Sequence, residues 1–360
     1  MTAAQGCYRL TVIALALTLG APASGAGQDD PRRVILFIGD GVGVGYWTAA
    51  AFARDRLAVK QFPVVGLVDV RSSSGRVPDS AASATSYATG VETYNGAVGV
   101  GRDSTAVDTV LEVAAERDMA TGLVATSRIT HATPASFAAH VPNRQLEWEI
   151  ARQMANHDVT VMLGGGRAAF DGQIRPDSVD LLVSIKERYT YVETPEELQA
   201  LNMRNVKALF GLFAPSHLPA APARVPTLPQ MTEAALAVLD EDPDGFFLMV
   251  EASQPDWRGH GNEPLPAITA EMLDFDRAIG EAVEYQRDHP ETLIVVVGDH
   301  ETGGLALQYD STGTLGAAYT TGSHTATMVP LFAKGPGAEQ FGGILSNARV
   351  GELLMEAVRR

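Results

Sequence analysis

The chain alternates between short apolar runs and longer amphipathic segments. Each apolar run lacks charged residues and is followed by glycine or by polar residues. Runs of this kind are typical of strands that are buried on both faces, as in a parallel sheet. They occupy residues 34–38, 64–68, 121–125, 159–163, 246–250, 293–297 and 329–333.

The amphipathic segments lie between these runs. Their apolar residues recur every three to four positions with charges between them, which is the pattern of a helix with one buried face. Asp103 and Ser104 stand where an N-cap would begin the first of them. The alternation predicts an α/β fold, a three-layer sandwich whose largely parallel central sheet is flanked by helices on both faces. The predicted helices occupy residues 105–117, 145–156, 231–239, 268–287 and 347–358.

The first 26 residues have the layout of a signal peptide. A lone charge, Arg9, precedes an apolar run at 10–19, and small residues lead to a cleavage position near Ala26. We therefore expect an exported protein, periplasmic or secreted. No polar linker divides residues 27–360, which we expect to form one domain. Residues 168–229, weakly periodic and ending in a Pro/Ala-rich stretch, are predicted to be a cap or loop excursion.

The amino-acid composition limits which ligands and partners the chain can have. The only cysteine, Cys7, lies in the predicted signal peptide, so any metal site must use histidine, carboxylate and hydroxyl ligands. The net charge is −16, and without Arg9 the remaining 26 Lys and Arg stand against 43 Asp and Glu, which gives −17. Such a charge argues against binding to nucleic acid or to an anionic membrane. Only the N-terminal run approaches the length of a membrane span, and Gly20 and Pro22 interrupt it, which argues against an integral membrane protein.

Several apolar runs end in residue types that ligate metals. Ligands of parallel α/β sheets bind beyond the carboxyl ends of the strands. One carboxylate there is usually a cap or a turn residue, but several in one sheet indicate a cation site. Oxygen and imidazole ligands without sulfur suit zinc, and an oxygen-only set suits magnesium. The candidates are Asp40, Glu251, Asp256, His260, Asp299, His300 and His324.

A second candidate site is Ser80, which follows Pro78 and Asp79 and precedes a run of small residues. This pattern predicts a tightly packed helix whose free N–H groups surround the Ser80 hydroxyl and can bind phosphate. The simpler alternative is that Asp79 or Ser80 is only an N-cap.

Five further histidines have no such placement at a strand end. Most are expected to be surface or capping groups. His131 is the exception, because it shortly follows the run at 121–125 and lies two residues before Thr133. The five are His131, His140, His157, His217 and His289.

These motifs together resemble the alkaline phosphatase family. They follow one another in the family's order from about residue 33 to the C-terminus. Each motif alone is weak, but the set is specific. The matching stretches are Ile38-Gly39-Asp40-Gly41, Asp79-Ser80-Ala81-Ala82-Ser83-Ala84-Thr85, Thr89-Gly90 with Tyr94-Asn95-Gly96, His131-Ala132-Thr133-Pro134-Ala135, His140-Val141-x-x-Arg144, Glu251, Asp256-x-x-x-His260, Asp299-His300-Glu301-Thr302-Gly303-Gly304 and His324-Thr325.

The resemblance implies hydrolysis of phosphate monoesters through a phosphoserine intermediate, with two Zn²⁺ and one Mg²⁺ as cofactors. Ser80 would be the nucleophile and Arg144 would bind the phosphoryl oxygens. His131 and Trp257 would contact the substrate, at positions where the best-known bacterial pattern has Asp and Lys. The implied ligands are Asp256, His260 and His324 for one zinc, Asp40, Asp299 and His300 for the other, and Asp40, Thr133 and Glu251 for magnesium.

The sequence leaves two alternatives open. One is a phosphodiesterase or a sulfatase-like hydrolase built on the same sheet. The other is an exported protein that binds phosphate or metal without turnover. The resemblance also favours a homodimer, without indicating which surface would form the contact.

Overall fold

The computed structural model describes residue 2 and residues 31–360. The predicted signal peptide and Cys7 lie outside this part of the chain. A ten-stranded sheet crosses the molecule in the order β14-β2-β13-β8-β1-β7-β3-β4-β6-β5, and within it only β13 runs antiparallel to its neighbours. Its strands are β1 Arg33–Gly39, β2 Val64–Asp69, β3 Ala120–Arg128, β4 Val161–Gly165, β5 Thr190–Val192, β6 Leu209–Leu212, β7 Phe246–Ala252, β8 Thr292–Gly298, β13 Val329–Lys334 and β14 Gly343–Ser346.

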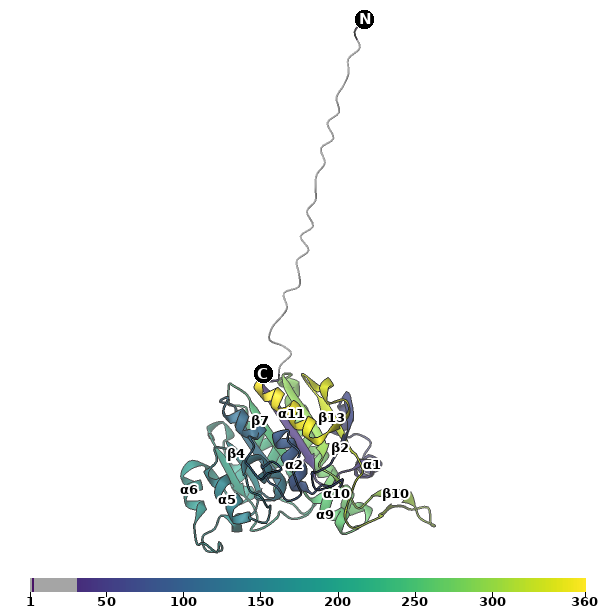
Figure 1. Cartoon of the computed structure of the whole chain (residues 1–360), viewed down its shortest axis with the longest axis horizontal. Coiled ribbons are helices and arrows are strands. Elements are labelled where there is room, and N and C mark those ends of the chain that lie inside the picture. Colours follow the sequence, from purple (N-terminus) through teal and green to yellow (C-terminus); the bar gives the residue numbers. More distant parts are fainter. Residues whose placement is uncertain (1, 3–30) are drawn as a thin grey trace.

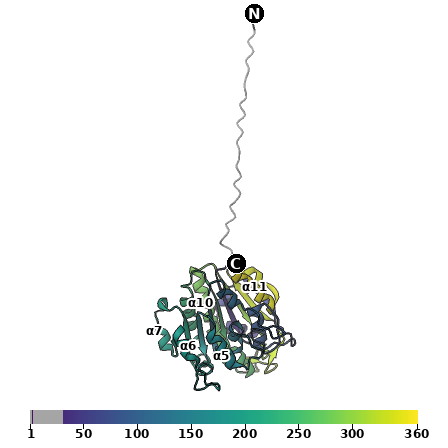
Figure 2. The ribbon, with the colours of Figure 1, turned by 60° about the vertical axis from the view of Figure 1, so that its left-hand side comes forward.

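Helices cover both faces of this sheet (Figures 1 and 2). On β1, Val34 and Leu36 belong to one apolar core, whereas Ile35 and Phe37 belong to the other. The predicted α/β sandwich is therefore confirmed. The helices are α1 Val44–Ala53, α2 Ser80–Thr89, α3 Val110–Ala115, α4 Ala132–Ala138, α5 Glu147–Asn156, α6 Leu181–Arg188, α7 Pro195–Ala200, α8 Leu228–Leu239, α9 Gln254–His260, α10 Leu265–Asp288 and α11 Asn347–Arg359.

Two short sheets lie outside the main one. β9 (Glu301–Thr302) pairs with β12 (His324–Thr325), and this pairing brings two distant segments of the chain together. β10 (Ala306–Tyr309) and β11 (Leu315–Ala318) form a hairpin that projects from the body of the molecule in Figure 1.

The first predicted helix starts later than expected. α3 begins at Val110, because Thr109 accepts a hydrogen bond from the Glu112 N–H and the Glu112 side chain accepts one from the Thr109 N–H. This reciprocal capping box satisfies two N–H groups that the helix itself leaves unpaired. Asp103, expected at the N-cap, instead accepts from Thr105 within a turn.

Residues 168–229 differ from the predicted cap or loop excursion. They contribute β6, which pairs with β4, and β5, which forms the edge of the main sheet. These strands have only three and four residues, too few for their periodicity to stand out in the sequence. This part of the chain therefore extends the sheet.

A buried arginine fastens the end of that segment to α10. Arg224 is 1% exposed and donates to Glu271 and to Asp274, each at 2.7 Å, and to the carbonyl of Pro219 at 3.0 Å. Both acids lie on α10. Removing one partner of a buried ion pair leaves the opposite charge without compensation, so the guanidinium is essential to this contact.

We expect Arg224→Met to lower the free energy of unfolding by about 3–5 kcal/mol, because it strands two buried carboxylates. Arg277→Met is the matched control, since Arg277 pairs with Asp274 at 3.6 Å but its side chain is 50% exposed. An exposed pair contributes about 0–1 kcal/mol. Chemical denaturation measures both variants, and equal losses would contradict a special role for the buried arginine.

Candidate active site

The candidate ligands converge at the carboxyl ends of the central strands. Asp40 follows β1, Glu251 is the second-to-last residue of neighbouring β7, and Asp299 follows β8 on the other side of β1. The Asp40 N–H donates to the carbonyl of Ala252 at 3.0 Å, which joins the ends of β1 and β7. The parallel register therefore places these three acids side by side, as the sequence predicts.

The first ligand group contains Asp256, His260 and His324. The His260 and His324 Nε2 atoms are 3.1 Å apart, and they lie 3.4 and 3.6 Å from the Asp256 Oδ1. Bonds of about 2.0–2.1 Å to a tetrahedral zinc would place ligand atoms about 3.3 Å apart. The group therefore has the spacing of a zinc site.

Hydrogen bonds decide which imidazole nitrogens of this group face inward as acceptors. The His260 Nδ1 donates to the carbonyl of Gly322 at 2.8 Å, and the His324 Nδ1 donates to the carbonyl of Pro78 at 2.9 Å. With the protons on Nδ1, both Nε2 lone pairs point at each other and at a carboxylate. Such an arrangement is repulsive by itself and favourable around a cation.

The second ligand group contains Asp40, Asp299 and His300, whose side chains are fully buried. The His300 Nε2 lies 3.4 Å from the Asp40 Oδ1 and 3.3 Å from the Asp299 Oδ2. Among the described residues, neither oxygen of Asp40 has a hydrogen-bond partner, and the Asp299 Oδ2 has none. Buried polar atoms normally find partners, so these unpaired oxygens fit a cation.

A third group surrounds Glu251. Its Oε2 accepts from Ser253 and Ser127 at 2.6 and 3.2 Å, whereas its Oε1 is buried and unpaired in the described chain. Thr133, on the second position of α4, has a buried and unpaired Oγ1 as well. Ligand atoms of Asp40, His131 and Glu251 lie within 4.8 Å of one another. The carboxylate oxygens of Asp40 and Glu251 and the hydroxyl of Thr133 are hard ligands, which suit magnesium.

The contact between His131 and Arg144 indicates which nitrogen of the His131 ring carries the proton. A guanidinium only donates, so the Arg144 Nη2, 3.3 Å away, makes the His131 Nε2 an acceptor. The proton of the neutral ring then lies on Nδ1, which is buried and unpaired among the described atoms. A protonated nitrogen cannot ligate a metal, so this tautomer fits contact with a bound molecule.

One hydroxyl connects the first two groups. The Thr302 Oγ1 donates to Asp256 at 2.5 Å and accepts from the His300 Nδ1 at 3.2 Å. The carbonyl of Thr302 in turn accepts from the Tyr46 hydroxyl at 2.6 Å. Gly41, at φ +74°, passes so close to Asp256 that a Cβ would lie 2.7 Å from its Cα. The supporting atoms are therefore closely packed and hydrogen-bonded.

Ser80 is the first residue of α2 and faces the second ligand group. Asp79 caps the helix by accepting from the Ala82 N–H at 3.0 Å. Ser80 is 3% exposed, and its hydroxyl lies 3.3 Å from the His300 Nε2. The helix N-terminus and the capping interaction are both confirmed, and the hydroxyl reaches the metal-ligand cluster.

Arg144 reaches the same place from the segment before α5. Its Nη1 donates to Asp79 at 3.0 Å, so the capping residue of Ser80 also orients the guanidinium. The structure therefore brings Ser80 and Arg144 together through one shared partner.

Trp257 and His217 complete this side of the cluster. Their rings lie 4.5 Å apart, and the His131 ring lies 6.3 Å from Trp257 and 5.6 Å from His217. The expectation of a surface or capping group misses this aromatic contact of His217. Its signal is absent from the local sequence, since His217 follows the short strand β6 rather than a strong apolar run.

Burial and mutual repulsion shift the pKa values of the cluster. Burial raises the pKa of Glu251 and of Asp299 to about 7, and the charge of Asp256 adds to the effect at Asp299. Asp40 has a pKa well above its ordinary value, first from burial and then from the neighbouring carboxylates. Burial lowers the pKa of His300 to about 3. Cations reverse the effect on the acids, because they favour the ionised carboxylates.

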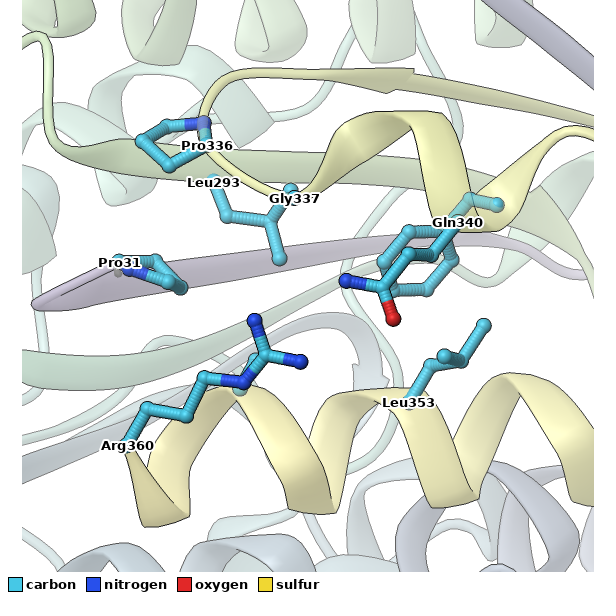
Figure 3. A pocket seen from close by; sticks show the side chains of 9 residues that line it. Pro31, Leu293, Pro336, Gly337, Gln340, Leu353 and Arg360 are labelled. Atoms are coloured by element: carbon cyan, nitrogen blue, oxygen red, sulfur yellow. The ribbon is translucent and has the colours of Figure 1, made fainter. Parts of the chain in front are cut away.

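A pocket on the other side of the molecule from this cluster has different chemistry. It lies at the opposite end of β8, between Pro31, Leu293 and α11 (Figure 3). None of its described lining residues is a carboxylate or a histidine. It therefore offers no comparable ligand set.

The alkaline phosphatase family model matches residues 31–317. Alkaline phosphatase 3 of Bacillus subtilis (strain 168) is 40% identical over 302 residues, which cover 79% of this chain and 64% of that protein. The chain thus spans less than two thirds of that relative's length. Streptomycin-6-phosphate phosphatase of Streptomyces griseus is 31% identical, with 93% of each chain covered.

A solved structure shows the same fold. The alkaline phosphatase of the Antarctic bacterium TAB5 superposes with a TM-score of 0.86 at 37% identity, covering 92% of this chain and 99% of that one.

We expect the stability of chelated protein to fall as the pH rises from about 4 to about 7. The raised pKa values mean that the folded state binds more protons than the unfolded state in this window, where unfolded carboxyls titrate near 4. Deprotonation then leaves repelling buried charges. Calorimetric melting temperatures measure this slope, and Asp299→Asn should reduce it.

Zinc and magnesium should remove most of that loss, because the ions neutralise the same carboxylates. A melting temperature of chelated protein that rises over this pH range, or that does not change when ions are added, would contradict the expectation.

The sequence match, the superposition and the ligand cluster agree: the chain belongs to the alkaline phosphatase family.

Proposed function

We propose that the chain hydrolyses phosphate monoesters, with Ser80 as the nucleophile and a phosphoserine intermediate. The observation that carries the proposal is the position of the Ser80 hydroxyl, 3.3 Å from the His300 Nε2 in a cluster of buried unpaired oxygens. Structures of TAB5 variants with Mg bound in a site called M3 support a metal requirement. Because the chain spans less than two thirds of the length of Alkaline phosphatase 3, the phosphatase activity of that relative is assigned to this chain only as part of the proposal.

The proposed cofactors are two Zn²⁺ and one Mg²⁺. When bound, the ions would lower the pKa of the serine hydroxyl and of a water molecule and neutralise charge on the phosphoryl and leaving oxygens. The buried oxygens without hydrogen-bond partners in the described chain support this assignment, because they are free to ligate a metal. The ligands would be Asp256, His260 and His324 for one zinc, Asp40, Asp299 and His300 for the second, and Asp40, Thr133 and Glu251 for magnesium.

The residues of the chain divide the reaction between them. Ser80, held at the start of α2, attacks phosphorus in line with the leaving alcohol and becomes phosphorylated. Arg144 donates to two phosphoryl oxygens as charge redistributes, and Asp79 keeps its guanidinium oriented. His131 and Trp257, whose rings lie 6.3 Å apart, would contact the bound phosphate as well. Water then cleaves the phosphoseryl ester and regenerates Ser80.

Export and assembly belong to the same proposal. We infer that residues 1–26 are a signal peptide and that residues 27–360 act as one exported domain. In the described part of the chain, none of the helices has both the length and the apolar character of a membrane span. Family membership supports a homodimer.

We expect Ser80→Ala to lower kcat for 4-nitrophenyl phosphate by about three orders of magnitude or more, because it removes the attacking oxygen. Ser184→Ala is the control, since the Ser184 hydroxyl donates a hydrogen bond to the carbonyl of Leu181 on α6, away from the cluster. Labelling with ³²P-phosphate at acidic pH should mark the wild type and not Ser80→Ala. Unchanged turnover in the variant would overturn the nucleophile.

The preference for monoesters is tested separately. A dianionic phosphoryl group can meet Arg144 and the cation cluster together, whereas a diester carries one charge less. We expect kcat/KM for 4-nitrophenyl phosphate to exceed that for bis-4-nitrophenyl phosphate by at least about a hundredfold. Comparable values would favour a phosphodiesterase, and no turnover of either ester by the metal-loaded protein would favour a binding protein.

A further inference from the structure

His140 lies between two hydrogen-bond acceptors, away from the metal-ligand cluster. Its Nδ1 is 2.6 Å from the carbonyl oxygen of Gly99, and its Nε2 is 2.8 Å from the Glu112 Oε1. A carbonyl and an ionised carboxylate can only accept. Both ring nitrogens must therefore donate, and only the imidazolium form of histidine has two N–H groups.

The charged groups that face His140 favour this form. Glu112 on α3 and Asp108, which precedes α3, are negative, and His157 at the end of α5 shares the Glu112 Oε1 at 3.1 Å. The hydrogen bond to Glu112 raises the pKa of His140 against the opposing effect of burial. Burial alone would raise the pKa of Glu112, but hydrogen bonds from His140 and His157 hold it well below its usual range.

His140 also begins the segment that carries Arg144. The Val141 N–H and carbonyl pair with those of Val98, and the Arg144 N–H donates to the carbonyl of Gly96 at 2.8 Å. Residues 96–99 thus hold both ends of the segment, and Gly99 supplies the acceptor for His140.

The same loop holds the partner of the guanidinium. The Gly96 N–H donates to the Asp79 carboxylate at 3.0 Å, and Asp79 accepts from Arg144. At Gly99, φ is +60° and a Cβ would lie 2.9 Å from the His140 Nδ1. The loop, the His140 ring and the Arg144 segment are therefore packed as one unit.

We propose that the imidazolium form of His140 is a positioning element for Arg144, and that loss of its proton at alkaline pH weakens the binding of phosphate. Deprotonation turns one N–H into a lone pair that faces an acceptor, so the contact with Gly99 or with Glu112 becomes repulsive. The segment is then held less firmly, although its backbone bonds to residues 96–99 remain. The proposal rests on the proposed function, in which Arg144 binds the phosphoryl oxygens. Because coupling between two bound species is reciprocal, phosphate must raise the pKa of His140 in turn.

The direct test is an NMR titration of the histidines in the full, metal-loaded chain, with and without saturating inorganic phosphate. His140 should titrate above the ordinary value of about 6.5. A fivefold coupling would raise that pKa by about 0.7 with phosphate. His289 is the control, since it pairs with Asp240 at the opposite end of the sheet. A pKa of His140 at or below the ordinary value, or one that phosphate does not move, would overturn the proposal.

Two variants separate positioning from a merely structural role. His140→Gln should bind inorganic phosphate about fivefold more weakly than the wild type below the pKa of His140 and equally well above it. Glu112→Gln should move the pH at which phosphate affinity falls toward the ordinary histidine value. Dissociation constants are measured by calorimetry between about pH 6 and pH 10.

The ratio of variant to wild-type dissociation constants cancels titrations that both proteins share. A ratio that stays constant with pH would assign His140 a structural role only and would overturn the proposal. The titration of the wild type gives the answer if a variant fails to fold. Wild-type protein that neither binds phosphate nor hydrolyses monoesters would overturn the proposed function itself, whereas binding without pH-dependent coupling would overturn only the role of His140.

Discussion

The structure depends on a cluster of buried negative charge that its own side chains do not neutralise. Asp40, Asp299 and Glu251 lie at the ends of adjacent strands, fully buried, and four of their six carboxylate oxygens lack hydrogen-bond partners in the described chain. Burying an unpaired carboxylate is costly. Elsewhere the chain pairs its buried ions, as Arg224 does with Glu271 and Asp274. The contrast is what the proposed cation site requires, and a structural ion pair would not leave these oxygens unpaired.

The surroundings of the cluster keep it from collapsing. His260 and His324 are held by backbone carbonyls, and His300 is held by Thr302, so that each Nε2 lone pair points inward. The backbone of β9 is held in turn by the Tyr46 hydroxyl. These bonds preorganise the ligand atoms before any ion arrives, which lowers the cost of gathering them.

Much of the sheet could be predicted from the sequence, because its central strands are buried on both faces and read as continuous apolar runs. All seven predicted runs correspond to strands. β5, β6, β14 and the strands of the two small sheets escaped prediction, since strands of two to four residues carry no clear period. The predicted start of α3 at residue 105 is wrong. Thr109 and Glu112 form the capping box at which this helix begins, whereas Asp103 belongs to a separate turn.

The convergence of the candidate ligand residues could be predicted because each follows a strong strand or belongs to a family motif. The contacts of His140 and His217 could not, because they depend on segments far apart in the chain. His140 meets Gly99 and Glu112, which are 41 and 28 residues away. His217 meets Trp257 across the site, and its Nδ1 accepts from the Arg128 N–H at the end of β3. Both histidines are polar groups whose partners only the fold supplies. The hydrogen bonds thus place the histidines in three different settings: His260 and His324 donate through Nδ1 to backbone carbonyls, His131 lies beside the Arg144 guanidinium, and His140 lies between two acceptors.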